Sequence, residues 1–136
     1  MASRGKYEPG ERKLAVKRSS AGLGLFAGEP IPKGACVIEY VGRIVSAEES
    51  ETSKSKYLFE ISKTKTIDGK PSINKAGYIN HSCKPNCETQ IAKGRVFVMA
   101  LRAIRTGEEL TYDYGREYCL EHCVPCRCPA SKHLYG

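Results

Sequence analysis

The most informative stretch of this sequence is "YINHSCKPNCETQ", residues 78–90. Positions 80–87 hold two asparagines, a histidine, a serine, a proline and two cysteines, with one lysine among them. Such a run is too polar for a strand in the core of a protein. From these residues alone three readings are open: a metal site, a nucleophilic cysteine, or a loop that grips a small polar ligand.

Length and composition set the class of protein. The chain has 136 residues, of which 40% are hydrophobic and 27% charged, as in a folded domain with one modest core. No apolar run approaches the roughly 20 residues that cross a bilayer, and no apolar segment of a secretory signal follows the N-terminus. We therefore expect an intracellular protein without membrane contact.

The net charge of +7 is unevenly distributed, because residues 52–75 and residues 76–105 contribute +4 each. A basic surface is compatible with nucleic acid as a partner. However, no tight cluster of Lys and Arg with interleaved aromatic residues is present, so the simpler interpretation is a well-solvated surface.

Short strands dominate the predicted secondary structure, because brief alternating or apolar runs are separated by Gly and Pro. The one helical candidate is "AEESETSKSK", residues 47–56, with acidic residues early and lysines late. The predicted strands are 13–19, 25–27, 35–45, 56–62, 64–69 and 95–104, and 105–115 reads as a turn with a short strand. This pattern predicts a small, mostly β domain with a metal-stapled end.

Cysteines are concentrated at the C-terminus, in a tail with almost no aliphatic residues. Four cysteines fall within ten residues and two histidines accompany them: Cys119, Cys123, Cys126, Cys128, His122 and His133. Thiolate and imidazole groups at such spacings suit tetrahedral zinc, which would supply the folding energy that the tail cannot obtain by burial. The alternative, a cluster of free surface thiols, would be prone to oxidation.

Several motifs together resemble those of SET-domain protein lysine methyltransferases that carry a post-SET zinc-binding tail. The motifs are "GLG" at 22–24, "EYVG" at 39–42, "YLFEI" at 57–61, "YINHSCKPNC" at 78–87, "GEELTYDYG" at 107–115 and "CRC" at 126–128. The resemblance divides the chain into an N-terminal arm (1–11), a SET domain (12–115) and a post-SET-like tail (116–136). It implies a mostly β fold of small curved sheets with few short helices and a pseudo-knot, in which segments 78–87 and 109–115 meet.

The resemblance also implies a cofactor, S-adenosyl-L-methionine, on one face of the domain and a lysine channel that reaches it from the opposite face. The residues that match cofactor contacts are Leu23, Gly24, Tyr57, Asn80, His81 and Tyr114. Tyr40, Phe59 and Tyr112 match channel-lining positions, and Tyr114, Tyr112 and Tyr40 match the catalytic group. On this view the Asn-His pair of the opening stretch holds the cofactor.

The implied activity is S-adenosylmethionine-dependent protein-lysine N-methylation of a histone or another basic protein. Tyr112 stands where the family has Phe or Tyr, and a tyrosine leaves less room for extra methyl groups. We therefore expect mono-methylation as the main product and di-methylation as the second. Asp113 is expected to be a structural hydrogen-bond partner, and Glu109 an anchor of its loop.

A structural Zn²⁺ is implied with Cys83, Cys126, Cys128 and His133 as its ligands. Many family members have a cysteine where this chain has His133, so Cys119 or Cys123 remains an alternative fourth ligand. Such a zinc would have no open position for catalysis.

This chain departs from the family pattern in two further places. Gly77 stands where many members have an arginine, and the insert over residues 46–56 is short. A short insert implies a minimal peptide groove, a site completed by a dimer, or loose substrate choice. Two other functions stay open: a catalytically weak SET-like module that binds a peptide or nucleic acid, and a zinc-stabilised interaction domain without cofactor.

Overall fold

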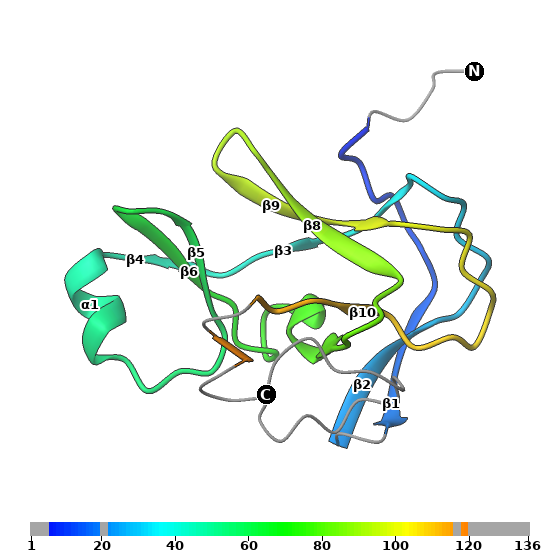
Figure 1. The fold of residues 1–136 in the computed structure, drawn as a ribbon, viewed down its shortest axis with the longest axis horizontal. Coiled ribbons are helices and arrows are strands. Elements are labelled where there is room, and N and C mark those ends of the chain that lie inside the picture. The colour runs from blue at the N-terminus through cyan, green and yellow to red at the C-terminus, as the bar shows by residue number, and fades with distance from the viewer. Residues whose placement is uncertain (1–5, 20–21, 116–117, 120–136) are drawn as a thin grey trace.

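The computed structural model describes residues 6–19, 22–115 and 118–119. Strands provide most of its regular structure, as predicted, together with one short α-helix and one 3₁₀ helix (Figure 1). The strands are β1 (Leu14–Ser19), β2 (Gly22–Ala27), β3 (Cys36–Tyr40), β4 (Arg43–Val45), β5 (Leu58–Ser62), β6 (Lys65–Asp68), β7 (Asn80–His81), β8 (Cys87–Ala92), β9 (Arg95–Ala100) and β10 (Thr111–Tyr112). The helices are α1 (Ala47–Thr52) and η1 (Lys75–Tyr78). Neither is long and apolar enough to cross a membrane.

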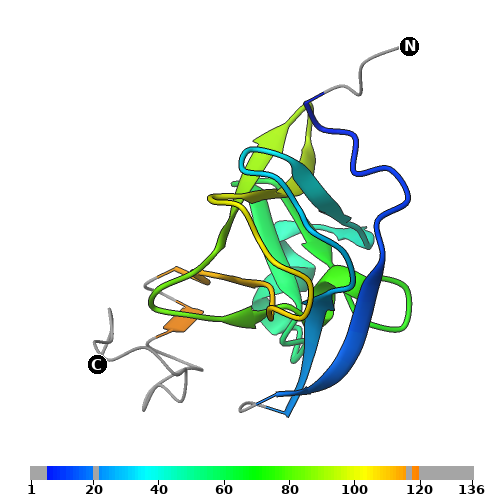
Figure 2. The same cartoon turned by 90° about the vertical axis from the view of Figure 1, so that its right-hand side faces the viewer.

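The strands form four small sheets rather than one large one. Their orders are β1-β2, β3-β9-β8, β4-β6-β5 and β10-β7, and only the last pair is parallel. In the turned view of Figure 2 the blue ribbon of β1 and β2 runs along one side of the molecule. Small sheets that pack around a shared core confirm the mostly β class and the curved architecture that the sequence predicted.

The core lies on both faces of β9, which explains why that stretch reads as a continuous apolar run. Val96 and Val98 are fully buried in the main cluster, whereas Phe97 and Met99 face a second cluster with Cys36. The strand ends at Ala100, earlier than predicted, because the chain turns there. Ile104 instead pairs with Ile31 through an isolated bridge.

A backbone contact divides the predicted strand 35–45 into β3 and β4. A Cβ on Gly42 would lie 2.2 Å from the carbonyl oxygen of Asp68, so only glycine allows this approach. The preceding amide, Val41 N, donates to Asn74 Oδ1 at 3.1 Å instead of to a neighbouring strand. The two halves can therefore join different sheets.

Local contacts determine where α1 begins and how β8 is formed. The predicted helix forms as α1, where Ser46 Oγ caps the N-terminus by accepting from Glu49 N at 3.1 Å. β8 was not predicted, because "CETQIA" lacks a clear apolar alternation. It forms by pairing with β9 across a tight turn in which Lys93 and Gly94 both have positive φ, 51° and 72°.

The segment that precedes β10 lies between β2 and β7. On one side Phe26 pairs with Glu109 and Leu110 N donates to Leu25 O at 2.8 Å. On the other side Thr111 pairs with Asn80, and Ser82 N donates to Tyr112 O at 3.2 Å. Segments 78–87 and 109–115 therefore meet, which confirms the knot-like packing predicted from the resemblance.

Candidate active site

Asn86 fixes the junction between β7 and β10. Its side chain is only 5% exposed. The amide nitrogen donates to Glu109 O at 2.8 Å, and the amide oxygen accepts from Thr111 N at 2.9 Å. The buried side chain of Asn86 thereby forms hydrogen bonds with two backbone groups of the segment that leads into β10. No role was predicted for Asn86, although its place within residues 78–90 was a signal.

A polar cluster, which we call the amide corner, consists of Leu23, Gly24, Asn80 and Glu109. Asn80 Nδ2 lies 3.0 Å from Leu23 O, 2.8 Å from Glu109 Oε2 and 3.0 Å from Ser19 Oγ. A carbonyl and a carboxylate can only accept, so the amide nitrogen must face them. Asn80 Oδ1, on the other branch of the amide, is then the atom left to accept from a ligand.

His81 follows Asn80 and joins β7 to the segment after β10. Its side chain is 6% exposed, and Nδ1 accepts from Tyr114 N at 3.1 Å. With its lone pair at Nδ1 engaged in this way, a neutral imidazole carries its proton on Nε2, which lies 3.4 Å from Cys83 Sγ. Asp113 accepts from Gly115 N at 2.9 Å, in agreement with the structural part expected of it.

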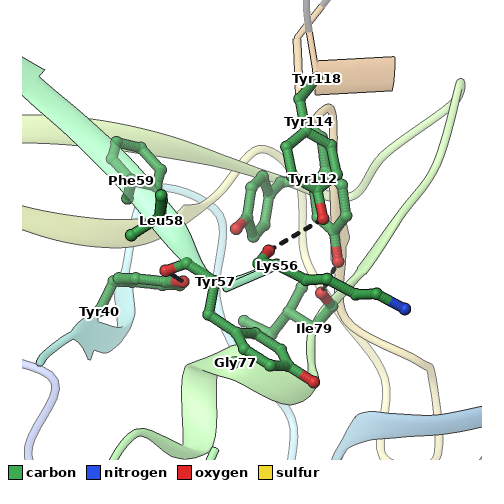
Figure 3. A pocket seen from close by; sticks show the side chains of 10 residues that line it. All are labelled: Tyr40, Lys56, Tyr57, Leu58, Phe59, Gly77, Ile79, Tyr112, Tyr114 and Tyr118. Atoms are coloured by element: carbon green, nitrogen blue, oxygen red, sulfur yellow. Dashed lines mark hydrogen bonds between the residues drawn. The ribbon is translucent and has the colours of Figure 1, made fainter. Parts of the chain in front are cut away.

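A narrow pocket of about 80 Å³ has aromatic walls and is lined in part by Ile79, the residue that precedes Asn80 of the amide corner (Figure 3). In Figure 3 the rings of Tyr112, Tyr114 and Tyr118 stand on one side, and Tyr40 and Phe59 on the other. The lining residues are Tyr40, Lys56, Tyr57, Leu58, Phe59, Gly77, Ile79, Tyr112, Tyr114 and Tyr118. We call this space the aromatic pocket. Its size and walls suit an unbranched chain that ends in one small polar group.

Two tyrosines of the aromatic pocket, Tyr40 and Tyr112, stay protonated. Burial raises the pKa of the Tyr40 phenol, and the nearby Tyr118, Asp68 and Tyr57 raise it further. Burial likewise raises the pKa of Tyr112, with smaller contributions from Tyr40 and Tyr118. Both phenols are therefore neutral near pH 7, so they can donate and accept hydrogen bonds but cannot act as tyrosinate bases.

Tyr114 connects the two halves of the site. Its amide donates to His81, its hydroxyl donates to Ile79 O, and its ring centroid lies 5.0 Å from that of Tyr112. Of the predicted site residues, Leu23, Gly24 and Asn80 thus gather in the amide corner. His81 lies between this corner and Tyr114, and Tyr40, Tyr57, Phe59, Tyr112 and Tyr114 line the aromatic pocket.

Five lining residues were not predicted as site residues: Lys56, Leu58, Gly77, Ile79 and Tyr118. Tyr118 packs edge-on against Tyr114 with centroids 5.2 Å apart, and its hydroxyl donates to Lys56 O at 2.9 Å. This contact brings the chain after β10 against the loop before β5. Among the described lining residues only Lys56 carries a charge, and its amine points away from the rings (Figure 3). An aromatic residue four positions after Tyr114 was the available signal for Tyr118.

Gly77 also lines the pocket, at the position where the resemblance predicted a departure from the family pattern. A Cβ there would lie 2.8 Å from Gly69 O, so a larger residue would require the backbone to shift. The packing of η1 against the turn at Gly69 therefore favours glycine at position 77.

The predicted zinc ligands fall into two groups. Cys83 is buried beside His81, whereas Cys126, Cys128 and His133 lie outside the described residues. Among the described residues, ligand atoms of His81, Asp113 and Cys119 lie within 4.8 Å of one another, and Cys119 Sγ is 3.5 Å from His81 Nδ1. The chemical types of these atoms suit zinc, and the thiols of Cys83 and Cys119 both lie beside the His81 ring.

The residues present fit the implied cofactor. A Cβ on Gly24 would lie 2.4 Å from Glu109 Oε2 and 3.2 Å from Asn80 Nδ2, so the backbone there can form a cradle only as glycine. The Asn80 amide, oriented with its oxygen as the remaining acceptor, matches a ligand that carries an ammonium group. The neutral aromatic walls beyond it match a sulfonium and its methyl group.

Comparison with known proteins agrees with this geometry. The SET domain family matches residues 22–115. The chain is 38% identical over 80% of its length to the Drosophila melanogaster histone-lysine N-methyltransferase trr, and 36% identical over 80% to the Homo sapiens histone-lysine N-methyltransferase 2D. It is 39% identical over 87% to an H3 lysine-4 specific histone-lysine N-methyltransferase of Chaetomium globosum.

The chain spans only a small part of these relatives, 5% of the Drosophila protein, 2% of the human protein and 13% of the Chaetomium protein. The similarity is therefore to one domain within them. The matched residues include the paired β7 and β10, the amide corner and every described lining residue of the aromatic pocket except Tyr118, and the chain belongs to the SET domain family.

Proposed function

We propose that this protein is an S-adenosylmethionine-dependent protein-lysine N-methyltransferase whose main product is mono-methyl-lysine, with di-methyl-lysine second. The observation that carries the proposal is the position of Tyr114. It belongs at once to the aromatic pocket and, through the hydrogen bond from its amide to His81, to the segment that begins with Asn80. A ligand in the amide corner and a side chain in the pocket would meet beside this tyrosine.

The cofactor would supply an electrophilic methyl group on a positively charged sulfur. The amide corner would bind the amino acid end of the cofactor, with Asn80 Oδ1 and the Leu23–Gly24 backbone as its contacts. The aromatic pocket would receive the substrate lysine. Alignment of the amine with the methyl carbon is the main task of the protein in such an in-line transfer.

The pocket also prepares the amine. Free lysine has a pKa of about 10.4, so most of it is protonated at pH 7. Aromatic walls exclude water and disfavour the ammonium form, and a neighbouring sulfonium charge disfavours it further. The hydroxyl of Tyr40 donates to Tyr57 O at 2.7 Å, so its oxygen can accept a hydrogen bond from the amine. Because Tyr40 and Tyr112 stay neutral, neither phenol takes up the proton of the amine. The proton can leave to solvent before the lysine is enclosed.

A histone or another lysine-containing basic tail is the proposed substrate. The relatives bear names of histone-lysine N-methyltransferases, and in the Chaetomium protein the name specifies lysine 4 of H3. In a eukaryotic cell such a substrate would place the protein on the chromosome, and in a bacterium the protein would act in the cytoplasm. We further propose that a structural Zn²⁺ holds the tail through Cys83, Cys126, Cys128 and His133, with Cys119 or Cys123 as the alternative to His133.

The test is incubation of the purified chain with isotope-labelled S-adenosylmethionine and core histones, followed by mass spectrometry of modified lysines. We expect label on lysine, mainly as a single methyl group. Asn80→Ala is the matched negative control, since it leaves the aromatic pocket intact. Failure of the wild-type chain to bind S-adenosylmethionine would remove the proposal, and trimethyl-lysine as the dominant product would contradict its product assignment.

A further inference from the structure

We propose that Glu109 is a positioning residue for the cofactor. Its carboxylate holds the Asn80 amide with the nitrogen turned inward, which presents Asn80 Oδ1 as the acceptor for the α-ammonium group of S-adenosylmethionine. This inference rests on the proposed function and adds a residue to it.

The orientation of an asparagine amide needs an external cause, because the two ends of the group have nearly the same shape. Here the strongest fixing contact is Glu109 Oε2, 2.8 Å from Asn80 Nδ2. An ionised carboxylate can only accept, and a hydrogen bond to a charged acceptor is stronger than one to a neutral group. Without it, only Leu23 O and Ser19 Oγ would hold the nitrogen, and the amide would turn its N–H groups toward a cationic ligand more readily, which is an unfavourable arrangement.

Glu109 is itself held firmly. Its backbone pairs with Phe26, and its carbonyl accepts from the buried Asn86 Nδ2 at 2.8 Å. Its carboxylate lies where a Cβ on Gly24 would lie, 2.4 Å from Oε2. The second glycine of the "GLG" motif therefore makes room for this carboxylate, and the carboxylate has little freedom to move elsewhere.

The neighbouring acid provides a contrast within the same motif. Glu108 points outward, where its carboxylate accepts from Arg102 Nη2 at 2.8 Å and from the amide of Arg105. Two consecutive glutamates thus have separate tasks, one on the surface and one behind the amide corner. Glu108 is accordingly a matched control for Glu109.

The test measures binding of S-adenosylhomocysteine by titration calorimetry, so it needs no turnover. Glu109→Met keeps the length of the side chain and removes both acceptors, and we expect it to weaken binding at least tenfold. Glu109→Gln can still offer an oxygen to Asn80 Nδ2, so we expect it to bind within threefold of the wild type. Glu108→Ala should bind within twofold. Circular dichroism and thermal unfolding check that each variant folds, and Glu109→Ala replaces Glu109→Met if that variant does not.

A second ligand separates positioning from a general disturbance of the site. In the deaminated analogue of S-adenosylhomocysteine a hydrogen replaces the α-amino group, so Glu109→Met should lose far less affinity for it than for the parent compound. Equal losses for both ligands would overturn the inference, as would unchanged binding of the parent compound. Glu109→Gln as weak as Glu109→Met would also overturn it, since the charge rather than the acceptor would then matter. If the wild type binds neither ligand, the proposed function fails instead.

Discussion

The amide corner and the aromatic pocket lie on either side of Tyr114, and they differ in how they can bind a ligand. The corner is polar and pre-oriented, because three acceptors fix the nitrogen of Asn80. The pocket is nearly uncharged, and burial keeps its phenols neutral, as the raised pKa values of Tyr40 and Tyr112 indicate. The amide corner therefore selects its ligand by the direction of its hydrogen bonds, whereas the aromatic pocket removes water from the group that it binds.

The largest effects that we predict come from two substitutions, one at Tyr114 and one in the amide corner. Tyr114→Phe removes a hydroxyl beside the reacting atoms, so we expect kcat to fall roughly 100-fold while the Kd for S-adenosylmethionine changes less than threefold. Asn80→Ala should instead raise that Kd at least tenfold. Initial-rate kinetics and calorimetry on both variants check the pair. If Tyr114→Phe mainly weakened cofactor binding, the two regions would not be separate in function.

A smaller change inside the aromatic pocket tests whether Tyr112 limits the number of methyl groups on the product lysine. Tyr112 is 7% exposed and its ring packs against Tyr114. Tyr112→Phe removes one hydroxyl and leaves room beside the amine, so we expect the ratio of di- plus trimethyl-lysine to mono-methyl-lysine to rise about tenfold, a free-energy difference of about 1.4 kcal/mol. Mass spectrometry of product at low conversion measures it.

The control for that change is Tyr118→Phe. Tyr118 lines the same pocket, but its hydroxyl is engaged with Lys56 O. We expect this variant to alter the rate without altering the product ratio. An unchanged ratio in Tyr112→Phe, or an equal rise in both variants, would contradict the assignment of product control to Tyr112.

The sequence predicted the two regions unequally. The aromatic pocket was largely predicted, because its residues fall in recognisable motifs around Tyr40, Phe59 and Tyr112. The orientation of the amide corner was not, since nothing in "GEEL" distinguishes the outward Glu108 from the inward Glu109. That distinction arises only when Glu109 pairs with Phe26 and Asn86 holds its carbonyl.

The fold shows the same limit. Strand positions followed from local apolar patterns, but the break between β3 and β4 required the approach of Gly42 to Asp68, which is distant in sequence. β8 likewise depends on its partner β9 and on the turn at Lys93 and Gly94. Contacts between distant segments decide these features, and a local pattern carries no record of them.

The smallest effect that we predict concerns two buried thiols, those of Cys36 and Cys87. It tests whether the core is as inaccessible to water as the aromatic pocket. Burial raises the pKa of Cys36 to about 11 and that of Cys87 to about 12, from a usual value of 9.0. Since the folded values are the higher ones, each thiol stabilises the folded protein fully below pH 9, and this stability is lost as the pH rises from 9 toward those values.

Between pH 9 and pH 10 the ionisation of each thiol in the unfolded chain should lower the free energy of unfolding by about 1 kcal/mol. Urea unfolding at several pH values measures the slope, and Cys36→Ala and Cys87→Ala should each reduce it. Ellman's reagent at pH 8 should leave both thiols unmodified in the native protein. Rapid labelling of either one, or a slope that neither variant changes, would mean that water reaches these sheets and that the dryness of the aromatic pocket does not extend into the core beneath it.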